Sequence, residues 1–175
     1  MSAYKDALRV AMENFAQDPR ARFIGYGVRE PGRGGGTFSG VPKEQCVETP
    51  VAENLMVGMA IGMALTGLKP LVYIERADFL LNALDAIVNH LNAMSTISRG
   101  EFTPTIILRV VVGNSQKPLF TGPTHTQDFS EALRHMVKFP VMRLHTADEV
   151  VAGYASAITG LKFISSALFE YKDLL

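Results

Sequence analysis

The chain has 175 residues, the length of one ordinary domain, and with 47% hydrophobic and only 19% charged residues it is not expected to be disordered. Seventeen basic residues balance seventeen acidic ones and form no basic run, which argues against a nucleic-acid partner. A single cysteine, Cys46, and the absence of a signal-peptide pattern predict a cytoplasmic protein. The longest apolar stretch, 55–68, is shorter than the roughly 20 residues of a membrane span, so we expect a buried helix and no membrane partner.

The first elements in chain order are a helix, a strand and a glycine-rich loop. Apolar residues from Tyr4 to Phe15 recur at the spacing of one helix face, and Ser2 is placed to cap the start of that helix. A short strand is predicted over 22–28. The Pro-Gly-Arg-Gly-Gly-Gly sequence of 31–36 predicts a mobile loop without regular structure. No Lys-Ser/Thr pair follows these glycines, so we interpret them as a plain connection and not as a phosphate-binding loop.

The rest of the chain alternates between helices and strands. The predicted helices are 50–66, 80–94, 130–137 and 146–159, and the predicted strands are 71–75, 105–112, 141–144 and 167–170. Strands separated by helices pair in parallel, because a parallel crossover needs a dozen or more residues. We therefore predict an α/β fold with a doubly wound parallel sheet in three α/β/α layers, formed by a single domain over 1–175.

Three strand-to-helix turns carry the polar residues that chemistry needs. In an open parallel sheet, ligands bind beyond the carboxyl ends of the strands, where such turns lie. The turns are 49–53, which places an acid at the head of an apolar helix, 75–79, and 122–127. The third turn is part of a loop over 113–127 that is longer than a plain connection needs, and long loops are commonly functional.

Taken one at a time, the residues of these turns have ordinary explanations. Glu53 fits the preference of acids for helix N-termini, and His125 is a polar loop residue that can titrate near neutral pH. Asp78 could form a solvent-facing ion pair with Arg76. No metal-ligand spacing and no serine in a nucleophile elbow appears, so the sequence predicts neither a metal site nor a catalytic triad.

Taken together, the turns resemble the pyrimidine-binding domain of thiamine-diphosphate enzymes. The resemblance rests on Glu-Thr-Pro-Val-Ala-Glu-Asn at 48–54, Gly-Leu-Lys-Pro-Leu-Val at 67–72, and 77–89, which opens with Ala-Asp-Phe. These segments are most similar to the β subunit of 2-oxo acid dehydrogenases of the pyruvate dehydrogenase type, as is the segment 169–175. The Gly-Pro-Thr-His-Thr-Gln segment at 122–127 is instead similar to transketolase and deoxyxylulose-phosphate synthase.

The resemblance implies thiamine diphosphate as cofactor and gives Glu53 a role. In the family, the matching glutamate binds the pyrimidine N1′ and promotes the imino tautomer, whose nitrogen removes the proton from the thiazolium C2. An apolar environment raises a carboxyl pKa and helps it share a proton with the ring. The neighbouring Val51, Ala52, Leu55 and Met56 are expected to provide that environment.

The same resemblance assigns three further residues. Phe79 matches the aromatic position that packs against the pyrimidine, and Asn82, one helical turn later, is a candidate for lining the cofactor site. His125 matches the histidine that faces the substrate, where it would hydrogen-bond to the carbonyl or transfer a proton. Glu53 and His125 are therefore the expected catalytic residues, and Glu53, Phe79 and Asn82 the expected cofactor-binding ones.

Two departures from the family bear on partners. Gly27 is followed by Val-Arg-Glu where the dehydrogenase β subunits usually carry an acidic pair, and nothing resembles the diphosphate-binding half with its Gly-Asp-Gly motif. The resemblance therefore implies a partner subunit that holds the diphosphate and Mg²⁺, in a dimer of heterodimers, with a homodimer as the alternative in isolation. The chain is also expected to lack the C-terminal domain of those β subunits.

The function expected from this resemblance is that of a pyrimidine-binding subunit in a heteromeric thiamine-diphosphate enzyme. With its partner it would act on a 2-oxo acid by oxidative decarboxylation and acyl or two-carbon transfer. Two alternatives stay open. One is ketol transfer on a ketose by a transketolase-type or deoxyxylulose-phosphate-synthase-type subunit. The other is a non-catalytic assembly or regulatory subunit, which the changed residues after Gly27 favour.

Overall fold

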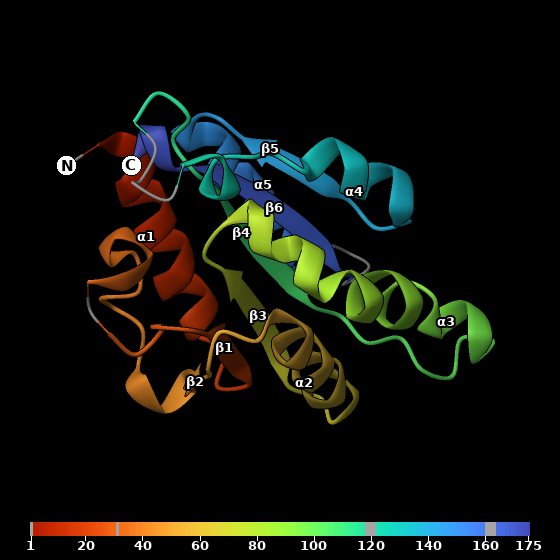
Figure 1. Cartoon of the computed structure of the whole chain (residues 1–175). Helices are drawn as coiled ribbons and strands as arrows, with labels where there is room; N and C mark the ends of the chain where they lie inside the picture. Colours follow the sequence, from red (N-terminus) through yellow and green to blue (C-terminus); the bar gives the residue numbers. More distant parts are fainter. Residues whose placement is uncertain (1, 31, 118–121, 160–163) are drawn as a thin grey trace.

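A computed structural model, which describes residues 2–30, 32–117, 122–159 and 164–175, contains a six-stranded sheet between two layers of helices (Figure 1). The strands are β1 (Ala21–Gly25), β2 (Cys46–Glu48), β3 (Lys69–Ile74), β4 (Ile107–Val112), β5 (Val141–Leu144) and β6 (Ser166–Tyr171). They pair in the order β2-β1-β3-β4-β6-β5, and each neighbouring pair is parallel. The predicted doubly wound α/β fold is confirmed.

Helices cover both faces of this sheet. They are α1 (Ala3–Ala16), α2 (Glu53–Leu65), α3 (Met94–Ile97), α4 (Ser130–Met136) and α5 (Ala147–Thr159). Successive side chains of a strand point to opposite faces, so Tyr73 packs in the core under α1 and α5. Val72 and Ile74 pack in the second core, under α2 and α4. Strands covered on both faces explain the continuous apolar runs in the sequence.

The helical segment after β3 differs from the single helix predicted over 80–94. It begins earlier, as the 3₁₀ segment η3 (Ala77–Ala83), and continues as the π-helical segment η4 (Asp85–Leu91) before α3. The side chain of Asn54, on α2, accepts a hydrogen bond of 3.2 Å from the backbone N–H of Ala86. A side chain inserted into the backbone ladder interrupts regular α-helical bonding, and hydrophobic spacing alone does not reveal such an insertion.

Three features near the start of the chain also differ from the prediction. The strand predicted over 22–28 ends at Gly25, because Gly27 has a φ of 74° in the left-handed region and turns the chain. Strand β2 was not predicted, since its three residues are too short to show a period. The glycine-rich loop contains a 3₁₀ segment, η1 (Arg33–Gly36), with three glycines at positive φ.

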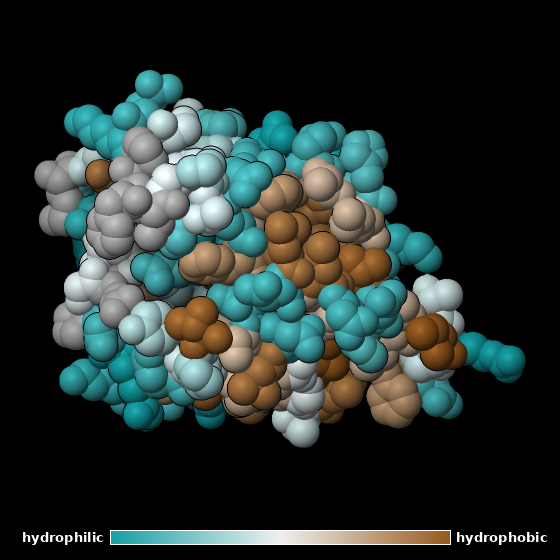
Figure 2. Space-filling view, in the orientation of Figure 1, coloured by the Kyte–Doolittle hydropathy of each residue, from teal (hydrophilic) through white to brown (hydrophobic). Residues whose placement is uncertain are grey.

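Helix α2 is buried on one face only, which corrects the expectation of a fully buried helix. Met56 and Val57 lie in the core, whereas Leu55 is 55% and Leu65 is 44% exposed. Figure 2 shows apolar side chains on this outer face of the molecule. A Cβ added at Gly58 would meet no atom within 4 Å, so the small residues of α2 leave an open surface. Among the described residues, no helix has the length and apolar composition needed to span a membrane.

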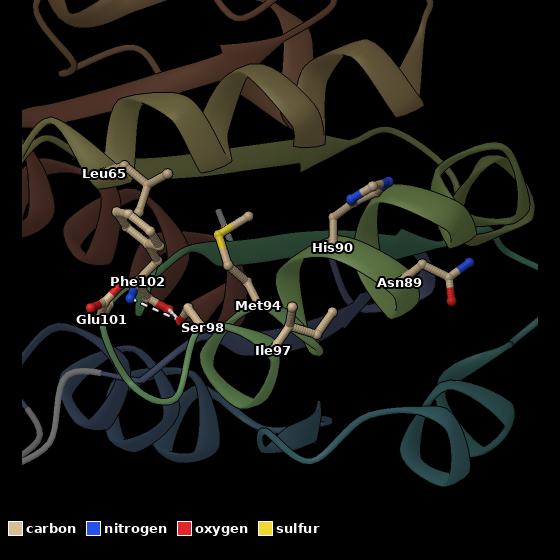
Figure 3. Close-up of a pocket in the computed structure, with 8 residues that line it drawn as sticks. All are labelled: Leu65, Asn89, His90, Met94, Ile97, Ser98, Glu101 and Phe102. Atoms are coloured by element: carbon tan, nitrogen blue, oxygen red, sulfur yellow. Dashed lines mark hydrogen bonds between the residues drawn. The ribbon is translucent and has the colours of Figure 1, made fainter.

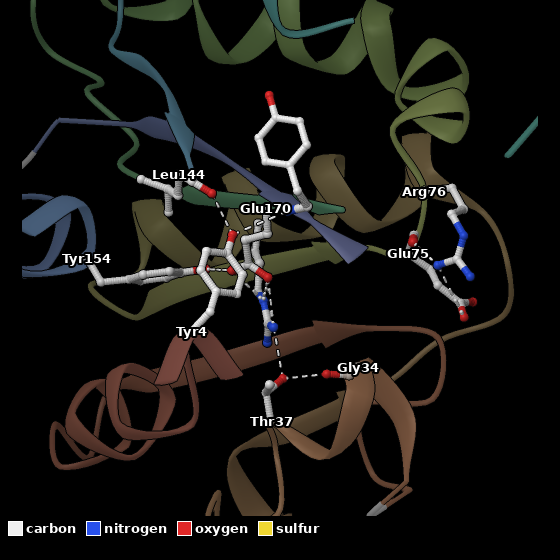
Figure 4. A network of polar contacts seen from close by, with 10 residues as sticks. Tyr4, Gly34, Thr37, Glu75, Arg76, Leu144, Tyr154 and Glu170 are labelled. Atoms are coloured by element: carbon white, nitrogen blue, oxygen red, sulfur yellow. Dashed lines mark hydrogen bonds and ion pairs between the residues drawn. The ribbon is translucent and has the colours of Figure 1, made fainter. Parts of the chain in front are cut away.

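A buried polar network joins the sheet to α5 and to the segment between β1 and β2, which we call the first loop (Figure 4). The guanidinium of Arg109, on β4, donates to both carboxylate oxygens of Glu170, on β6, at 2.9–3.0 Å, and to the hydroxyl of Thr37 at 2.8 Å. Tyr154, on α5, donates to the same carboxylate at 2.5 Å. Burial alone would lower the pKa of Arg109, but the Glu170 charge raises it above its ordinary value.

Aromatic rings enclose this network. The Arg109 guanidinium carbon lies 4.7 Å from the centre of the Phe38 ring and 5.2 Å from that of Tyr73. Burial raises the pKa of the Tyr73 phenol to about 12. On the far side, Tyr4 donates a 2.6 Å hydrogen bond to the carbonyl of Leu144 and so ties α1 to β5. The network thus fixes the positions of elements that are distant in sequence.

Candidate functional site

Glu53 is the first residue of α2 and is buried, with 5% of its surface exposed. Among the described residues its carboxylate accepts one side-chain hydrogen bond, from the amide of Asn82 on η3, at 3.4 Å. Buried carboxylates are normally held by several donors, because burial without partners is costly. Glu53 therefore keeps acceptor capacity for a ligand. The structure brings together two residues that are 29 positions apart and that the sequence assigned to one site.

The surroundings of Glu53 are less apolar than predicted. Val51 is 59% and Leu55 is 55% exposed, and of the apolar neighbours only Met56 is deeply buried, at 2%. The predicted apolar environment is therefore supplied only in part by these neighbours. In the same turn the hydroxyl of Thr49 is buried and has no hydrogen-bond partner among the described residues. Two polar groups of the turn thus have unused hydrogen-bonding capacity.

Phe79 and His125 form the second pair of the site. Phe79 lies on η3 and His125 in η5 (Gly122–His125), and their ring centres are 5.1 Å apart at an interplanar angle of 85°. This is the edge-to-face arrangement that aromatic rings prefer. The hydroxyl of Thr124 lies 3.1 Å from Nδ1 of His125, within hydrogen-bond distance. Residues on two separate turns are again brought into contact.

Segment η3 connects the two pairs. It packs against α2 and against η5, and it carries both Phe79 and Asn82. The four residues predicted for the site therefore come from three segments that meet at the carboxyl end of the sheet. This is the edge at which open parallel sheets bind ligands.

Two residues that the sequence analysis did not assign to the site hold His125 in place. Asp78 is buried and accepts hydrogen bonds from the side chain of Gln127, at 2.9 Å, and from its backbone N–H, at 3.3 Å. The predicted solvent-facing pair with Arg76 is therefore wrong. Gly113 directly follows β4, and a Cβ there would lie 1.7 Å from the carbonyl oxygen of His125. The available signal was a glycine directly after a buried strand.

A wide cavity lies away from this site. It has a volume of about 600 Å³ and lies between the end of α2 and α3, where Leu65, Met94, Ile97 and Phe102 face it (Figure 3). Its lining is mainly apolar and includes none of the four predicted site residues. Ligand sites combine an apolar pocket with convergent polar groups. The wide cavity supplies the first feature and the turn at Glu53 supplies the second, but the two are not combined in one pocket.

The fold and the position of these turns define an α/β protein whose ligand site lies at the carboxyl end of a parallel sheet. Comparison with known families is specific. The model of the transketolase pyrimidine-binding domain matches residues 1–175. The chain belongs to this family, which confirms the resemblance inferred from the sequence. Thiamine diphosphate is the cofactor that this family implies.

Curated relatives include β subunits of 2-oxo acid dehydrogenases. The pyruvate dehydrogenase E1 component subunit beta of Porphyra purpurea is 37% identical over 70% of this chain and 38% of its own length. That of Acholeplasma laidlawii is 35% identical over 73% of this chain and 32% of its own length. The 2-oxoisovalerate dehydrogenase subunit beta of Bacillus subtilis is 29% identical over 63% and 36% of the two chains. The matches span about a third of these relatives.

A solved structure supports the fold. The protein described as "Split gene transketolase, inactive beta4 tetramer" superimposes with a TM-score of 0.72. The match covers 98% of this chain and 52% of the other, at 15% sequence identity. At that identity the likeness is one of fold.

Proposed function

We propose that this chain supplies the pyrimidine-facing half of a thiamine-diphosphate site that is completed by a second polypeptide. The observation that carries the proposal is Glu53, a buried acid whose side chain has, among the described residues, a single hydrogen bond of 3.4 Å. An acid in this state is suited to bind a ring nitrogen and share its proton. The open side of the same turn, where Val51 and Leu55 are exposed, leaves room for the partner.

The proposed roles of the residues are those that the family resemblance implies. Thiamine diphosphate supplies the carbon nucleophile at C2 of its thiazolium ring, while the protein supplies binding and protonation. Glu53 holds a proton at N1′ of the pyrimidine, and Asn82 orients the Glu53 carboxylate through its amide. Phe79 packs against the pyrimidine ring. His125, held at the edge of Phe79, faces the substrate carbonyl and donates a hydrogen bond or a proton there.

The diphosphate and Mg²⁺ are assigned to the partner chain. The described residues contain no cluster of three or more His, Cys, Asp or Glu side chains that could hold a metal ion. The named relatives are β subunits, which supports a heteromeric assembly. The assembly that we propose is a dimer of heterodimers. The structural neighbour described as an inactive β4 tetramer supports self-association of this chain in isolation.

We infer a 2-oxo acid as substrate, because the relatives are named for pyruvate and 2-oxoisovalerate dehydrogenation. The reaction is then oxidative decarboxylation with transfer of the acyl or two-carbon group. Ketol transfer on a ketose remains the second candidate. It is favoured by the Gly-Pro-Thr-His segment and by the fold neighbour described as a split transketolase.

A tagged pull-down of the chain from its native extract is the first experiment. A stoichiometric partner that carries the Gly-Asp-Gly motif supports the proposal and provides the complex for assays with 2-oxo acids and ketoses. Recovery of the chain alone, or only with copies of itself, favours a non-catalytic subunit.

The second experiment compares Glu53→Gln with wild type in that complex. Loss of the proton-sharing carboxylate should lower turnover by about 10²–10⁴-fold, the range typical of acid–base groups, without changing assembly measured by size-exclusion chromatography. Glu44→Gln, which changes an exposed acid in another segment, is the matched control. Wild-type turnover in Glu53→Gln would contradict the proposed role.

A further inference from the structure

A second cavity, which has a polar lining, lies on the other side of β3 from Glu53. It has a volume of about 210 Å³ and is lined by the first loop, the end of β3 and the end of the chain. Side chains of Arg76, Arg109, Glu75 and Lys172 face it. Drug-sized ligands occupy cavities of about 300 Å³ or more, so this one suits a smaller molecule. None of Glu53, Phe79, Asn82 and His125 contributes to its lining.

Arg109 has an unused donor at this cavity. Its Nε and Nη2 atoms are occupied by Glu170 and Thr37, but Nη1 is buried and has no hydrogen-bond partner among the described residues. The side chain is 0% exposed, so bulk water does not solvate that nitrogen. A buried donor without an acceptor is rare and costly in native proteins. An acceptor bound in the cavity that Arg109 lines would give this donor a partner.

The other charges at the cavity are mostly positive. Arg76 is 6% exposed, and its guanidinium lies 3.9 Å from the carboxylate of Glu75, the one acid among the described lining residues. Figure 4 shows this pair apart from the Glu170 carboxylate. Loss of hydration, followed by repulsion from Arg76, lowers the pKa of Lys172 below its ordinary value. Three cationic side chains thus line the cavity, with Glu170 paired to Arg109 behind its wall and Glu75 next to Arg76.

Glycines form part of the remaining wall, together with Tyr73, Val111 and Leu175. Gly34 and Gly35 have φ values of 58° and 66°, a conformation that other residues rarely adopt. They keep side chains out of the cavity at the point where the first loop approaches Arg109. Part of the loop that the sequence suggested was a plain connection is therefore one wall of a positively charged cavity.

We propose that this cavity binds a small oxyanion, a carboxylate or a phosphate, through Arg109, Arg76 and Lys172. Guanidinium groups present paired donors that match the oxygens of both chemical groups. Arg109 is held rigidly by Glu170, so its free donor is preorganised for the ligand.

The bound oxyanion would lie next to the segment that carries His125. A smaller cavity of about 150 Å³ shares Arg76 and Lys172 with the oxyanion cavity, and it is also lined by Gly113 and His125. The two cationic side chains therefore stand between the oxyanion cavity and the loop that positions His125. Occupancy should stabilise this end of the sheet without contact to Glu53.

The test is ligand-dependent thermal unfolding of the 175-residue chain, followed by circular dichroism. Inorganic phosphate and malonate are added separately, with sodium chloride at equal ionic strength as the reference. A ligand at about five times its Kd should raise the midpoint by about 2–4 °C over chloride. A response to phosphate alone identifies a phosphate site, a response to malonate alone a carboxylate site, and a response to both a general oxyanion site. No response beyond chloride overturns the proposal.

Variants locate the binding. Arg76→Gln and Lys172→Gln should each raise the Kd of the bound oxyanion at least tenfold, measured by calorimetric titration below the unfolding temperature. Arg134→Gln and Lys138→Gln change exposed cations near the start of β5, at the opposite end of the sheet, and should respond as wild type does. Equal responses in all four variants would overturn the assignment. Glu53→Gln should retain the response, so this inference can fail or succeed independently of the proposed catalytic role.

Discussion

The polar network around Arg109 and the candidate site around Glu53 lie on the same sheet. They differ in how many hydrogen bonds the protein gives to the buried carboxylate of each. Glu170 is 0% exposed and accepts bonds of 2.5–3.0 Å from Arg109 and Tyr154. Glu53 is also buried, yet within the described part of the chain its carboxylate accepts one bond of 3.4 Å, from Asn82. One carboxylate is fully used by the protein, whereas the other retains most of its capacity.

The contrast shows what each group contributes. A buried acid with several donors fixes elements against one another, and Glu170 joins β4, β6 and α5 in this way. A buried acid with few donors adds little to the fold and remains available to a ligand. The satisfied hydrogen bonds near the candidate site belong to its supports, as in the contacts of Asp78 with Gln127. Rigid support around an unsatisfied group is what a functional site needs.

The largest expected effect comes from the network. Glu170→Gln leaves the charge of Arg109 buried without its counterion, and breaking such a pair typically costs about 3–5 kcal/mol. Urea denaturation of the isolated chain should show this loss. The matched control is Glu131→Gln on α4, whose side chain is 53% exposed and whose ion pairs are screened by solvent. An equal and small effect in both variants would remove the distinction between the two kinds of acid.

A smaller effect is expected where the site depends on its supports. In Gly113→Ala the new methyl group would meet the carbonyl of His125, so the loop must move. Misplacement of a catalytic group by about 1 Å can lower turnover by about 100-fold. The histidine ring signals in an NMR spectrum of the chain should shift. Gly58→Ala, where an added Cβ meets nothing within 4 Å, should leave those signals unchanged. Unchanged spectra in both variants would show that Gly113 does not position His125.

The smallest effect concerns Phe79. Replacement by leucine removes the ring but retains apolar volume, and a ring contact contributes about 0.5–1.5 kcal/mol beyond burial. In the reconstituted complex this corresponds to a loss of cofactor affinity of about 2- to 10-fold with little change in the turnover number. Phe102→Leu, at an exposed phenylalanine in the wide cavity, is the control. Equal affinities in the two variants would place Phe79 outside the cofactor site.

Much of the fold could be predicted from hydrophobic period and caps. Ser2 caps α1 as expected, because its hydroxyl accepts a hydrogen bond from the nearby backbone N–H of Lys5, and β5 has the predicted bounds. Strand β2 was missed because three residues cannot show a period. The π-helical segment after β3 is bonded at Ala86 to Asn54, which lies 32 residues earlier in the chain.

The candidate site was partly predictable for a similar reason. Glu53, Phe79 and His125 stand in strand-to-helix turns with recognisable neighbours, so each could be proposed from its own segment. Asp78 looked like a surface residue because its partner, Gln127, is distant in sequence. Arg109 lies within an apolar strand, and nothing adjacent to it in the chain indicates the Glu170 contact or the unused Nη1.

The sequence by itself determined the α/β class, the alternation of helices with strands that pair in parallel, the family and the residues proposed for the site. These depend on local spacing and short motifs, which the chain carries wherever it folds. Only the tertiary structure decided which face of α2 is buried, which acids are satisfied and where positive charge surrounds a cavity. Such properties depend on contacts between segments separated by tens of residues, and a linear pattern does not encode which groups will meet.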